Sequence, residues 1–171
     1  MTDAIETPWQ GKYLEVRQQG TWEYAARRGD LHAAVILAVH DGAVILVEQY
    51  RTPLGRRTIE LPAGLVGDQG EPETVEAAAA RELEEETGYR ADRIESLGIF
   101  ASSPGMTSET FTLIRATGLT RVGDGGGEEG EGITVHRVPL ADVPGFVAAK
   151  RDEGCAVDVK MLLVLAAGML G

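Results

Sequence analysis

The sequence has little cysteine and little positive charge, and each scarcity excludes a class of protein. Its 171 residues include one cysteine, Cys155, so no disulfide can form within the chain and a reducing compartment is expected. Lysine and arginine number 16 against 27 aspartates and glutamates, which gives a formal net charge of −11 at pH 7. A net charge this negative argues against nonspecific binding to nucleic acid or to an anionic membrane, because such binding requires basic patches.

Long apolar segments are absent as well. The longest apolar run, residues 161–170, is too short to cross a bilayer, which takes about 20 apolar residues, and it predicts a buried helix instead. Residues 1–10 contain neither the basic region nor the apolar region of a signal peptide. We therefore expect a cytoplasmic protein with no membrane and no nucleic-acid partner.

The length predicts one domain with a small appendage, and an apolar content of 43% is enough for a core. Residues 1–30 predict an N-terminal β arm of two strands joined around Gly20, and residues 31–171 predict the main domain. The arm carries Trp22, and unpaired strands at an edge invite pairing with another chain. We therefore expect the arm to form a two-fold homodimer.

Strands alternate with helices in the main domain, which indicates an α/β protein with a mixed sheet. Asp-Gly at positions 41–42 lies between two β-rich runs and predicts a hairpin, because glycine tolerates the positive φ of a tight turn. Residues 73–87 predict a helix whose apolar stripe contains Val75, Ala79 and Leu83. We expect the other strands at residues 58–61, 93–100, 109–116 and 133–139, loops at 62–72 and 122–132, and further helices at 140–150 and 157–170.

The predicted helix at 73–87 gathers carboxylates on one face. Glu82 and Glu86 are four residues apart and therefore adjacent, and Glu85 borders the same stripe. Like charges at this spacing destabilise a helix, so the face is either solvated or bridged by a cation. Carboxylate oxygens suit Mg²⁺, which takes one or two protein carboxylates together with waters and substrate phosphates.

A family resemblance favours the cation. Residues 67–89 resemble the Nudix box of hydrolases that cleave nucleoside diphosphates linked to another group. The matching positions are Gly67-x5-Glu73-x7-Arg81-Glu82-Leu83-x-Glu85-Glu86-x-Gly88-Tyr89. Three flanking phrases resemble the ADP-ribose pyrophosphatase branch of this family: Gln49-Tyr50-Arg51, Glu60-Leu61-Pro62-Ala63-Gly64 and Ser103-Pro104-Gly105. The resemblance implies a Nudix-type α/β/α sandwich with a mixed β-sheet, plus the N-terminal arm.

The resemblance also implies a metal site. It assigns Glu82 and Glu86 as direct ligands, Glu85 as a ligand of a second ion or its waters, and Glu131 as a further contact. The ion would be Mg²⁺, with Mn²⁺ able to substitute, and two or three ions would occupy each site. In the branch the box glycine follows Pro-Ala directly, which selects Gly64, whereas the spacing selects Gly67. The backbone carbonyl that helps hold metal is therefore that of Ala63 or, as the alternative, of Val66.

The Gly/Glu-rich stretch 122–132 reads either as an acidic linker or as the catalytic loop of the family. The second interpretation makes Glu129 the general base, with Glu128 and Glu131 as alternatives. Glycines on both sides would let such a loop close over substrate and reopen. On the helix, Arg81 is expected to pair with Glu85 or with Glu73 and so to orient the carboxylates.

The expected substrate contacts lie outside the box. The guanidinium of Arg51 suits a diphosphate, and Glu109 is a candidate for accepting hydrogen bonds from ribose hydroxyls. Trp22 and Tyr24 with Arg27 resemble the segment that stacks on adenine in this branch, often from the partner subunit.

The resulting hypothesis is a metal-dependent pyrophosphohydrolase that converts ADP-ribose to AMP and ribose 5-phosphate. Because the box contacts only the diphosphate, a hydrolase of another nucleoside diphosphate sugar such as GDP-mannose is an alternative. A non-catalytic nucleotide sensor on the same fold is a second alternative, and a plain acidic cation-binding protein is a third. A sensor has no need of a base, and a plain cation binder would not explain the flanking phrases.

Overall fold

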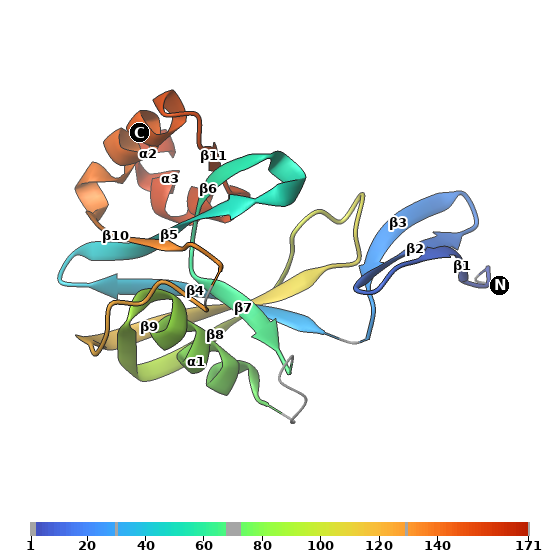
Figure 1. Ribbon diagram of the computed structural model, residues 1–171, viewed down its shortest axis with the longest axis horizontal. Coiled ribbons are helices and arrows are strands. Elements are labelled where there is room, and N and C mark those ends of the chain that lie inside the picture. The colour runs from blue at the N-terminus through green and yellow to red at the C-terminus, as the bar shows by residue number, and fades with distance from the viewer. Residues whose placement is uncertain (1–2, 30, 68–72, 129, 171) are drawn as a thin grey trace.

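The computed structural model describes residues 3–29, 31–67, 73–128 and 130–170. It has a body built on one mixed sheet and a three-stranded arm that projects from it (Figure 1). The arm contains β1 (Glu6–Gln10), β2 (Leu14–Gln19) and β3 (Trp22–Arg27), all antiparallel. The two strands expected around Gly20 are confirmed as β2 and β3, while β1 was not predicted.

The eight-stranded sheet of the body has the order β11-β6-β5-β4-β9-β8, with β10 paired to β5 and β7 to β4. Its strands are β4 (His32–His40), β5 (Ala43–Arg51), β6 (Arg56–Glu60), β7 (Ala63–Val66), β8 (Tyr89–Ala101), β9 (Thr110–Arg121), β10 (Thr134–Pro139) and β11 (Ala156–Val157). The pairs β4–β9 and β11–β6 are parallel and the others antiparallel, so the sheet is mixed.

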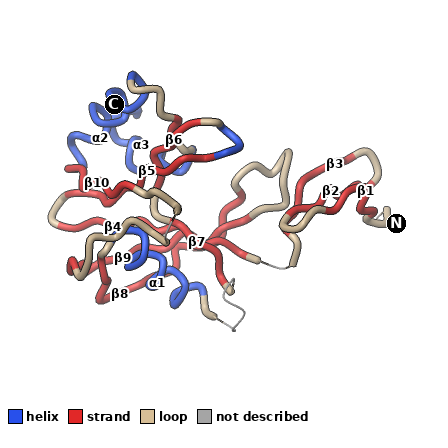
Figure 2. Tube along the Cα trace, in the orientation of Figure 1, coloured by secondary structure: helices blue, strands red, loops and turns tan. Residues whose placement is uncertain are grey.

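Helices cover both faces of this sheet, as the tube view in Figure 2 also shows. They are α1 (Val75–Thr87), α2 (Val143–Asp152) and α3 (Leu162–Leu170), with short 3₁₀ turns η1 (Thr52–Leu54), η2 (Leu140–Asp142) and η3 (Val159–Met161). The expected α/β/α sandwich is confirmed. Among the described residues no helix is long and apolar enough to cross a membrane.

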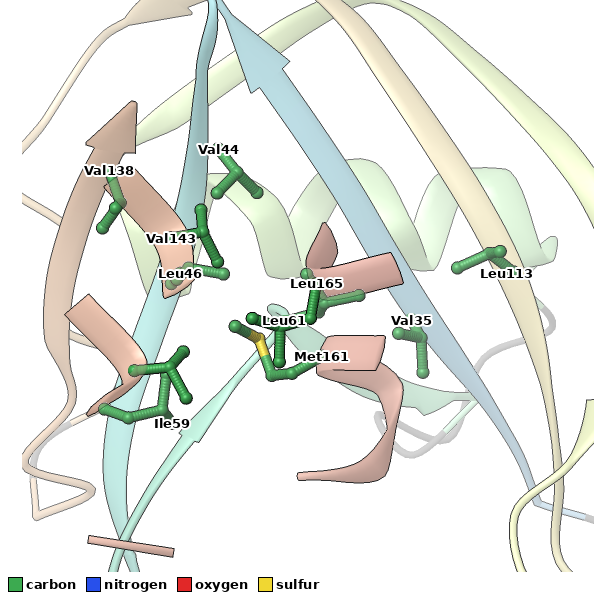
Figure 3. Close-up of a cluster of buried hydrophobic side chains, with 11 residues drawn as sticks. Val35, Val44, Leu46, Ile59, Leu61, Leu113, Val138, Val143, Met161 and Leu165 are labelled. Atoms are coloured by element: carbon green, nitrogen blue, oxygen red, sulfur yellow. The ribbon is translucent and has the colours of Figure 1, made fainter. Parts of the chain in front are cut away.

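Two apolar clusters hold these layers together. On one face Ala79 and Leu83 of α1 pack with buried residues of β4 and β9, including Ile36 and Ile114. On the other face Val143 and Val147 of α2 and Met161 and Leu165 near the C-terminus pack with buried residues of β4, β5 and β6 (Figure 3). Burial of apolar area at about 25 cal/mol per Å² makes these clusters the main source of stability.

The hairpin at positions 41–42 is confirmed, with φ of +47° at Asp41 and +69° at Gly42. The expectation of an irregular loop over residues 62–72 is wrong for its first part. Residues Ala63–Val66 form β7 and pair with the first half of β4, which would otherwise lack a neighbour on that side. Proline and glycine are uncommon inside strands, so the local sequence predicted a loop here. The strand forms because its backbone pairs with β4, which is distant in sequence.

The expected C-terminal helix over 157–170 begins later than predicted. Ala156 and Val157 pair with β6 as the short strand β11, and a 3₁₀ turn separates that strand from α3. The local apolar pattern alone could not distinguish a buried two-residue strand from the start of a helix.

A buried charge cluster joins three strands and a helix. Glu48 on β5 is 7% exposed; its carboxylate accepts from Arg57 Nε at 2.6 Å and lies 2.9 Å from His136 Nε2 and 3.1 Å from Lys150 Nζ. Burial by itself would raise the pKa of Glu48, but these hydrogen bonds together lower the pKa to about 2.

We expect this cluster to make stability depend on acid pH. A carboxyl whose pKa is about 2 in the folded state and 4.5 in the unfolded state stabilises above pH 4.5 and loses that effect as the pH falls towards 2. The contribution is about 3 kcal/mol. Glu48→Gln should therefore lower the free energy of unfolding at pH 7, measured in urea, and flatten its fall with acidification. Glu84→Gln, at an exposed pair with Arg90, is the matched control with little effect.

Candidate active site

Helix α1 presents three carboxylates because both of its ends are well formed. Thr74 caps the N-terminus by accepting a hydrogen bond from the backbone N–H of Ala77 at 3.2 Å. Gly88 ends the helix with φ of +71°, and its N–H donates to the carbonyl of Glu84 at 2.8 Å. The last two turns therefore hold the side chains of Glu82, Glu85 and Glu86 in a fixed frame.

The glycine-rich segment after β9 packs on the end of this helix. The N–H groups of Gly126 and Gly127 donate to the carbonyls of Glu86 at 2.8 Å and Glu85 at 3.1 Å. A Cβ at position 125 would lie 2.4 Å from the carbonyl carbon of Thr87, so only glycine fits there. These glycines donate hydrogen bonds to carbonyls at the end of the helix and let the segment approach it closely. Packing is therefore a reason for glycine here, in addition to the loop motion inferred from the sequence.

The far end of the same segment is also anchored. Arg57 on β6 donates from Nη2 to the carbonyl of Gly132 at 3.0 Å and to Thr134 Oγ1 at 3.3 Å. Its Nε binds Glu48 in the buried cluster. The loop between positions 127 and 132 is thus tied to the body at both ends.

Glu86 is the most deeply placed of the box carboxylates, at 6% exposed. Its Oε2 accepts from the backbone N–H of Ala63 on β7 at 3.0 Å. Burial raises the pKa of Glu86 to about 8; the Ala63 hydrogen bond opposes this, and the nearby charges of Glu82 and Glu131 add to it. Three of the predicted metal ligands are therefore electrostatic neighbours.

Arg81 orients the outer carboxylates of the helix. Its Nη1 lies 2.8 Å from Glu82 Oε1 and 3.0 Å from Glu85 Oε2, and its Nη2 lies 3.3 Å from Glu73 Oε2. Both pairings expected from sequence are confirmed. The pKa of Arg81 is raised by its hydrogen bond to Glu73 first and then by the charge of Glu82.

These side chains suit a hard divalent cation by their chemistry. In the described part of the chain, no three acidic, histidine or cysteine side chains are gathered closely enough to hold an ion as they stand. The donors are nevertheless all oxygens, and a buried carboxylate beside Glu82 and Glu131 is the charge pattern that a divalent cation relieves. Metal binding by Glu82, Glu85, Glu86 and Glu131 stays a prediction.

A cavity of about 360 Å³ opens beside this cluster. It is lined by Arg27, Ala33, Val35, Arg51, Pro53, Leu54, Thr58, Glu60, Ala63, Ser102, Glu109, Phe111, Val157, Asp158 and Lys160. Ala63 is a wall of the cavity and also the hydrogen-bond donor to Glu86, so the cavity and the carboxylates meet there.

The cations of the cavity are all held by acidic partners. Arg51 donates from Nε and Nη2 to the two carboxylate oxygens of Glu60, both at 2.7 Å. Arg27 Nη2 lies 2.7 Å from Glu109 Oε1. This pairing fixes the guanidinium groups before any ligand arrives, which reduces the entropy lost on binding.

A match to known proteins identifies the family. The model of the NUDIX domain matches residues 30–156, most of the chain. The chain belongs to the NUDIX family. That assignment agrees with the box residues and with the sandwich that carries them.

Individual NUDIX relatives agree with it. Over 120 residues the chain is 38% identical to ADP-ribose pyrophosphatase of Bacillus subtilis (strain 168), covering 69% of this chain and 63% of the relative. Over 119 residues it is 38% identical to Methanol dehydrogenase activator of Bacillus methanolicus, with the same coverages. The match thus spans less than two thirds of either relative. A crystal structure of an ADP compounds hydrolase, 23% identical, shares the fold with a TM-score of 0.73 over 100% of this chain and 94% of its own.

The structure brings most, but not all, of the predicted NUDIX site residues together. Arg27, Arg51, Ala63 and Glu109 line one cavity. Trp22 and Tyr24 instead line a second cavity of about 340 Å³ with residues of the 104–108 segment, and Trp22 is 62% exposed. Glu129 lies outside the described residues, so its role as base stays a prediction.

Sequence reasoning missed Thr58, Asp158 and Lys160 as cavity residues. The signal in the sequence that could have indicated Asp158 and Lys160 was their charge, since both stand at the start of an otherwise apolar C-terminal run. That run read as a helix, and only the parallel pairing of β11 with β6 carries the two residues to the cavity.

The two glycines that competed for the start of the NUDIX box have different functions. A Cβ at Gly64 would lie 1.9 Å from Glu82 Cδ, so Gly64 allows the strand to approach that carboxylate. Gly67 has φ of +78° and no described atom within 4 Å of a Cβ, so it serves the backbone turn. Ala63 contacts Glu86, whereas Val66 packs against the apolar cluster under α1.

We expect Gly64→Ala to lower activity while leaving the thermal midpoint nearly unchanged. The methyl group would push the flexible Glu82 side chain aside, and misplacing a reacting group by about 1 Å costs up to ~10²-fold. Gly67→Ala is the matched control; its positive φ strains alanine, so it should lower the midpoint and spare activity. The reverse ranking would show that Gly67, not Gly64, adjoins the chemistry.

Proposed function

We propose that the protein is a divalent-metal-dependent hydrolase that cleaves the diphosphate of ADP-ribose to give AMP and ribose 5-phosphate. The observation that carries this proposal is the position of Ala63. It lines a cavity whose arginines are ion-paired with glutamates, and its N–H donates to the buried carboxylate of Glu86. The name of one relative, the ADP-ribose pyrophosphatase of Bacillus subtilis, supports the substrate.

Arg51 is the proposed diphosphate contact. Glu60 holds its guanidinium at two points, so the fork is preoriented, and the Arg51 side chain is 43% exposed and therefore accessible. Arg27 and Glu109 would hold the nucleoside side, with Glu109 accepting from ribose hydroxyls.

The proposed chemistry is attack of water on one phosphorus in line with the bridging oxygen. When bound by Glu82, Glu86, Glu85 and Glu131, with the Ala63 carbonyl, two or three Mg²⁺ or Mn²⁺ ions supply charge neutralisation at the phosphates. Glu129 accepts the proton from the attacking water, and Arg81 keeps the outer carboxylates in position. The anchors at Gly126, Gly127 and Arg57 hold the ends of the loop that carries this base.

A substrate panel tests the proposal. ADP-ribose, GDP-mannose and nucleoside triphosphates are each incubated with Mg²⁺, and products are resolved by chromatography. We expect ADP-ribose to yield AMP and ribose 5-phosphate, with no turnover in EDTA and recovery on adding Mg²⁺ or Mn²⁺. Preferred turnover of GDP-mannose would support the alternative sugar, and turnover of triphosphates alone would contradict the proposal. Binding without turnover of any compound would support a nucleotide sensor.

We also propose a homodimer in the cytoplasm, with each arm reaching the partner's site. Three aromatic residues of the arm, Trp9, Tyr13 and Trp22, are 57%, 69% and 62% exposed, which is unusual for side chains of this size. Trp22 would then stack on the adenine of the partner's substrate.

Trp22→Ala should raise KM for ADP-ribose about tenfold or more, because stacking of a base on an aromatic ring is worth ~1–3 kcal/mol. Trp9→Ala, on the same arm but outside both cavities, is the control. Mixing Trp22→Ala with Glu82→Gln subunits should restore activity above either parent, since one site of the mixed dimer is intact. A monomer by light scattering, or no recovery after proven subunit exchange, would refute the crossed arm.

A further inference from the structure

Thr58 on β6 has a buried hydroxyl that no described residue satisfies. The residue is 3% exposed and lines the 360 Å³ cavity. Among the described residues, its Oγ1 is the one buried side-chain oxygen or nitrogen without a hydrogen-bond partner. Buried polar atoms are nearly always paired, so an unpaired one in a cavity wall indicates a partner from outside the chain.

Two charged residues stand next to Thr58 through backbone pairing. Ala156 of β11 lies opposite Thr58 in the parallel pair, and the N–H of Asp158 donates to the carbonyl of Ile59 at 3.0 Å. The carboxylate of Asp158 accepts from the backbone N–H and from Nζ of Lys160, both at 2.8 Å. Thr58, Asp158 and Lys160 all line the cavity.

This end of the cavity offers donors and acceptors in balance. Asp158 and Lys160 neutralise each other, so the local charge favours neither an anion nor a cation. Lys160 Nζ also lies 5.7 Å from the ring centroid of Phe111, another cavity residue, so the ammonium group is held against the cavity wall as well as by Asp158. A neutral group rich in hydroxyls matches this set, because each hydroxyl both donates and accepts.

The spacing of Thr58 and Glu60 along β6 leaves room for about one sugar ring. Thr58 and Glu60 both line the cavity and are two residues apart on a strand, hence ~7 Å apart along it. Glu60 holds Arg51, the proposed diphosphate contact, and Ala63 beyond it meets Glu86. Arg27, at the end of the arm strand β3, and its partner Glu109 are the proposed contacts of the nucleoside. Thr58 would therefore contact the group on the other side of the diphosphate.

We propose that Thr58, Asp158 and Lys160 form a subsite for the sugar attached to the phosphate remote from the nucleoside. The hydroxyl of Thr58 bonds a sugar hydroxyl, Asp158 accepts from another, and Lys160 donates to a third. The proposal rests on the proposed function, since it concerns the same cavity. It assigns selectivity for the terminal group to residues outside the NUDIX box.

The test uses Thr58→Val, which keeps the shape and removes the hydroxyl, and Thr58→Ser, which keeps the hydroxyl. With Mg²⁺, Thr58→Val should raise KM for ADP-ribose about three- to tenfold, the effect of one hydrogen bond, while Thr58→Ser stays near wild type. Calorimetric titration should show weaker binding of ribose 5-phosphate to Thr58→Val and unchanged binding of AMP. Thr58→Val should keep or raise the thermal midpoint, because the hydroxyl has no partner in the described part of the chain.

Each contrary outcome is informative. If ADP-ribose is hydrolysed but Thr58→Val changes neither KM nor ribose 5-phosphate affinity, Thr58 binds only a water and the subsite is refuted. Equal weakening of AMP and ribose 5-phosphate would indicate general distortion and would also refute it. If wild-type protein hydrolyses no nucleoside diphosphate, the proposed function fails, and the ribose 5-phosphate titration still decides the subsite separately.

Discussion

Glu86→Gln is expected to remove most of the activity and, in EDTA at pH 8, to raise the stability of the protein. The side chain is buried next to the charges of Glu82 and Glu131, and burial raises its pKa to about 8. Its carboxylate is therefore costly in the fold without a cation. Glutamine keeps the acceptor for the Ala63 N–H at the same place without the charge.

The activity loss should reach about 10³-fold, because metal ions contribute several kcal/mol to such reactions and each 1.36 kcal/mol is tenfold in rate. The stability gain has a pH signature. A carboxyl with a pKa of about 8 in the folded state and 4.5 in the unfolded state destabilises progressively as the pH rises between these values. In EDTA the wild type should lose about 3–5 kcal/mol over this window, and the variant should not.

The measurements are steady-state turnover of ADP-ribose and urea unfolding at pH 5 and pH 8, with EDTA or with Mg²⁺. Mg²⁺ should stabilise the wild type and have little effect on Glu86→Gln. Glu84→Gln, on the same helix but paired with Arg90 at the surface, is the control and should match wild type in both assays. A variant less stable than wild type in EDTA would mean that Glu86 is held by contacts stronger than its charge penalty.

Glu129→Gln is expected to lower kcat by ~10²–10⁴-fold, the usual contribution of a general base. Affinity for Mg²⁺ and KM should stay near wild type, because the substitution removes a proton acceptor and leaves the anchors of the loop in place. At one end of the loop, the N–H groups of Gly126 and Gly127 donate to carbonyls of helix α1. At the other end, Arg57 donates to the carbonyl of Gly132. Glu129 itself lies outside the described residues, so the reason comes from its neighbours and from the family resemblance.

Glu128→Gln is the matched control, one position away in the same loop, and should retain most of kcat. The decisive comparison is kcat for the two variants at saturating Mg²⁺ and substrate, with Mg²⁺ titrations of each. Wild-type kcat for Glu129→Gln would move the base to Glu128 or Glu131. Loss of Mg²⁺ affinity together with kcat would make Glu129 a ligand instead.

Several elements followed from local physics alone. Asp-Gly at 41–42 produced the expected hairpin because the required positive φ depends only on those residues. Helix α1 followed from the apolar spacing of Val75, Ala79 and Leu83, and the ion pairs of Arg81 followed from spacing along one helix. The family was also readable from sequence, because the box residues lie within a single short segment.

Contacts between distant segments were decided only by the tertiary structure. Strand β7 forms because its backbone pairs with the distant strand β4. Gly64 is required because Glu82, eighteen positions later, lies against it. Arg57 became an anchor of the loop through its approach to Gly132. Thr58 lies in a cavity wall because the C-terminal strand β11 pairs beside it and brings Asp158 and Lys160 to the same cavity. By itself the sequence determined the family, helix α1 and the acidic residues that this helix carries, since these depend on neighbours along the chain. The folded structure determined which side chains share a cavity, because that depends on pairing between strands far apart in sequence.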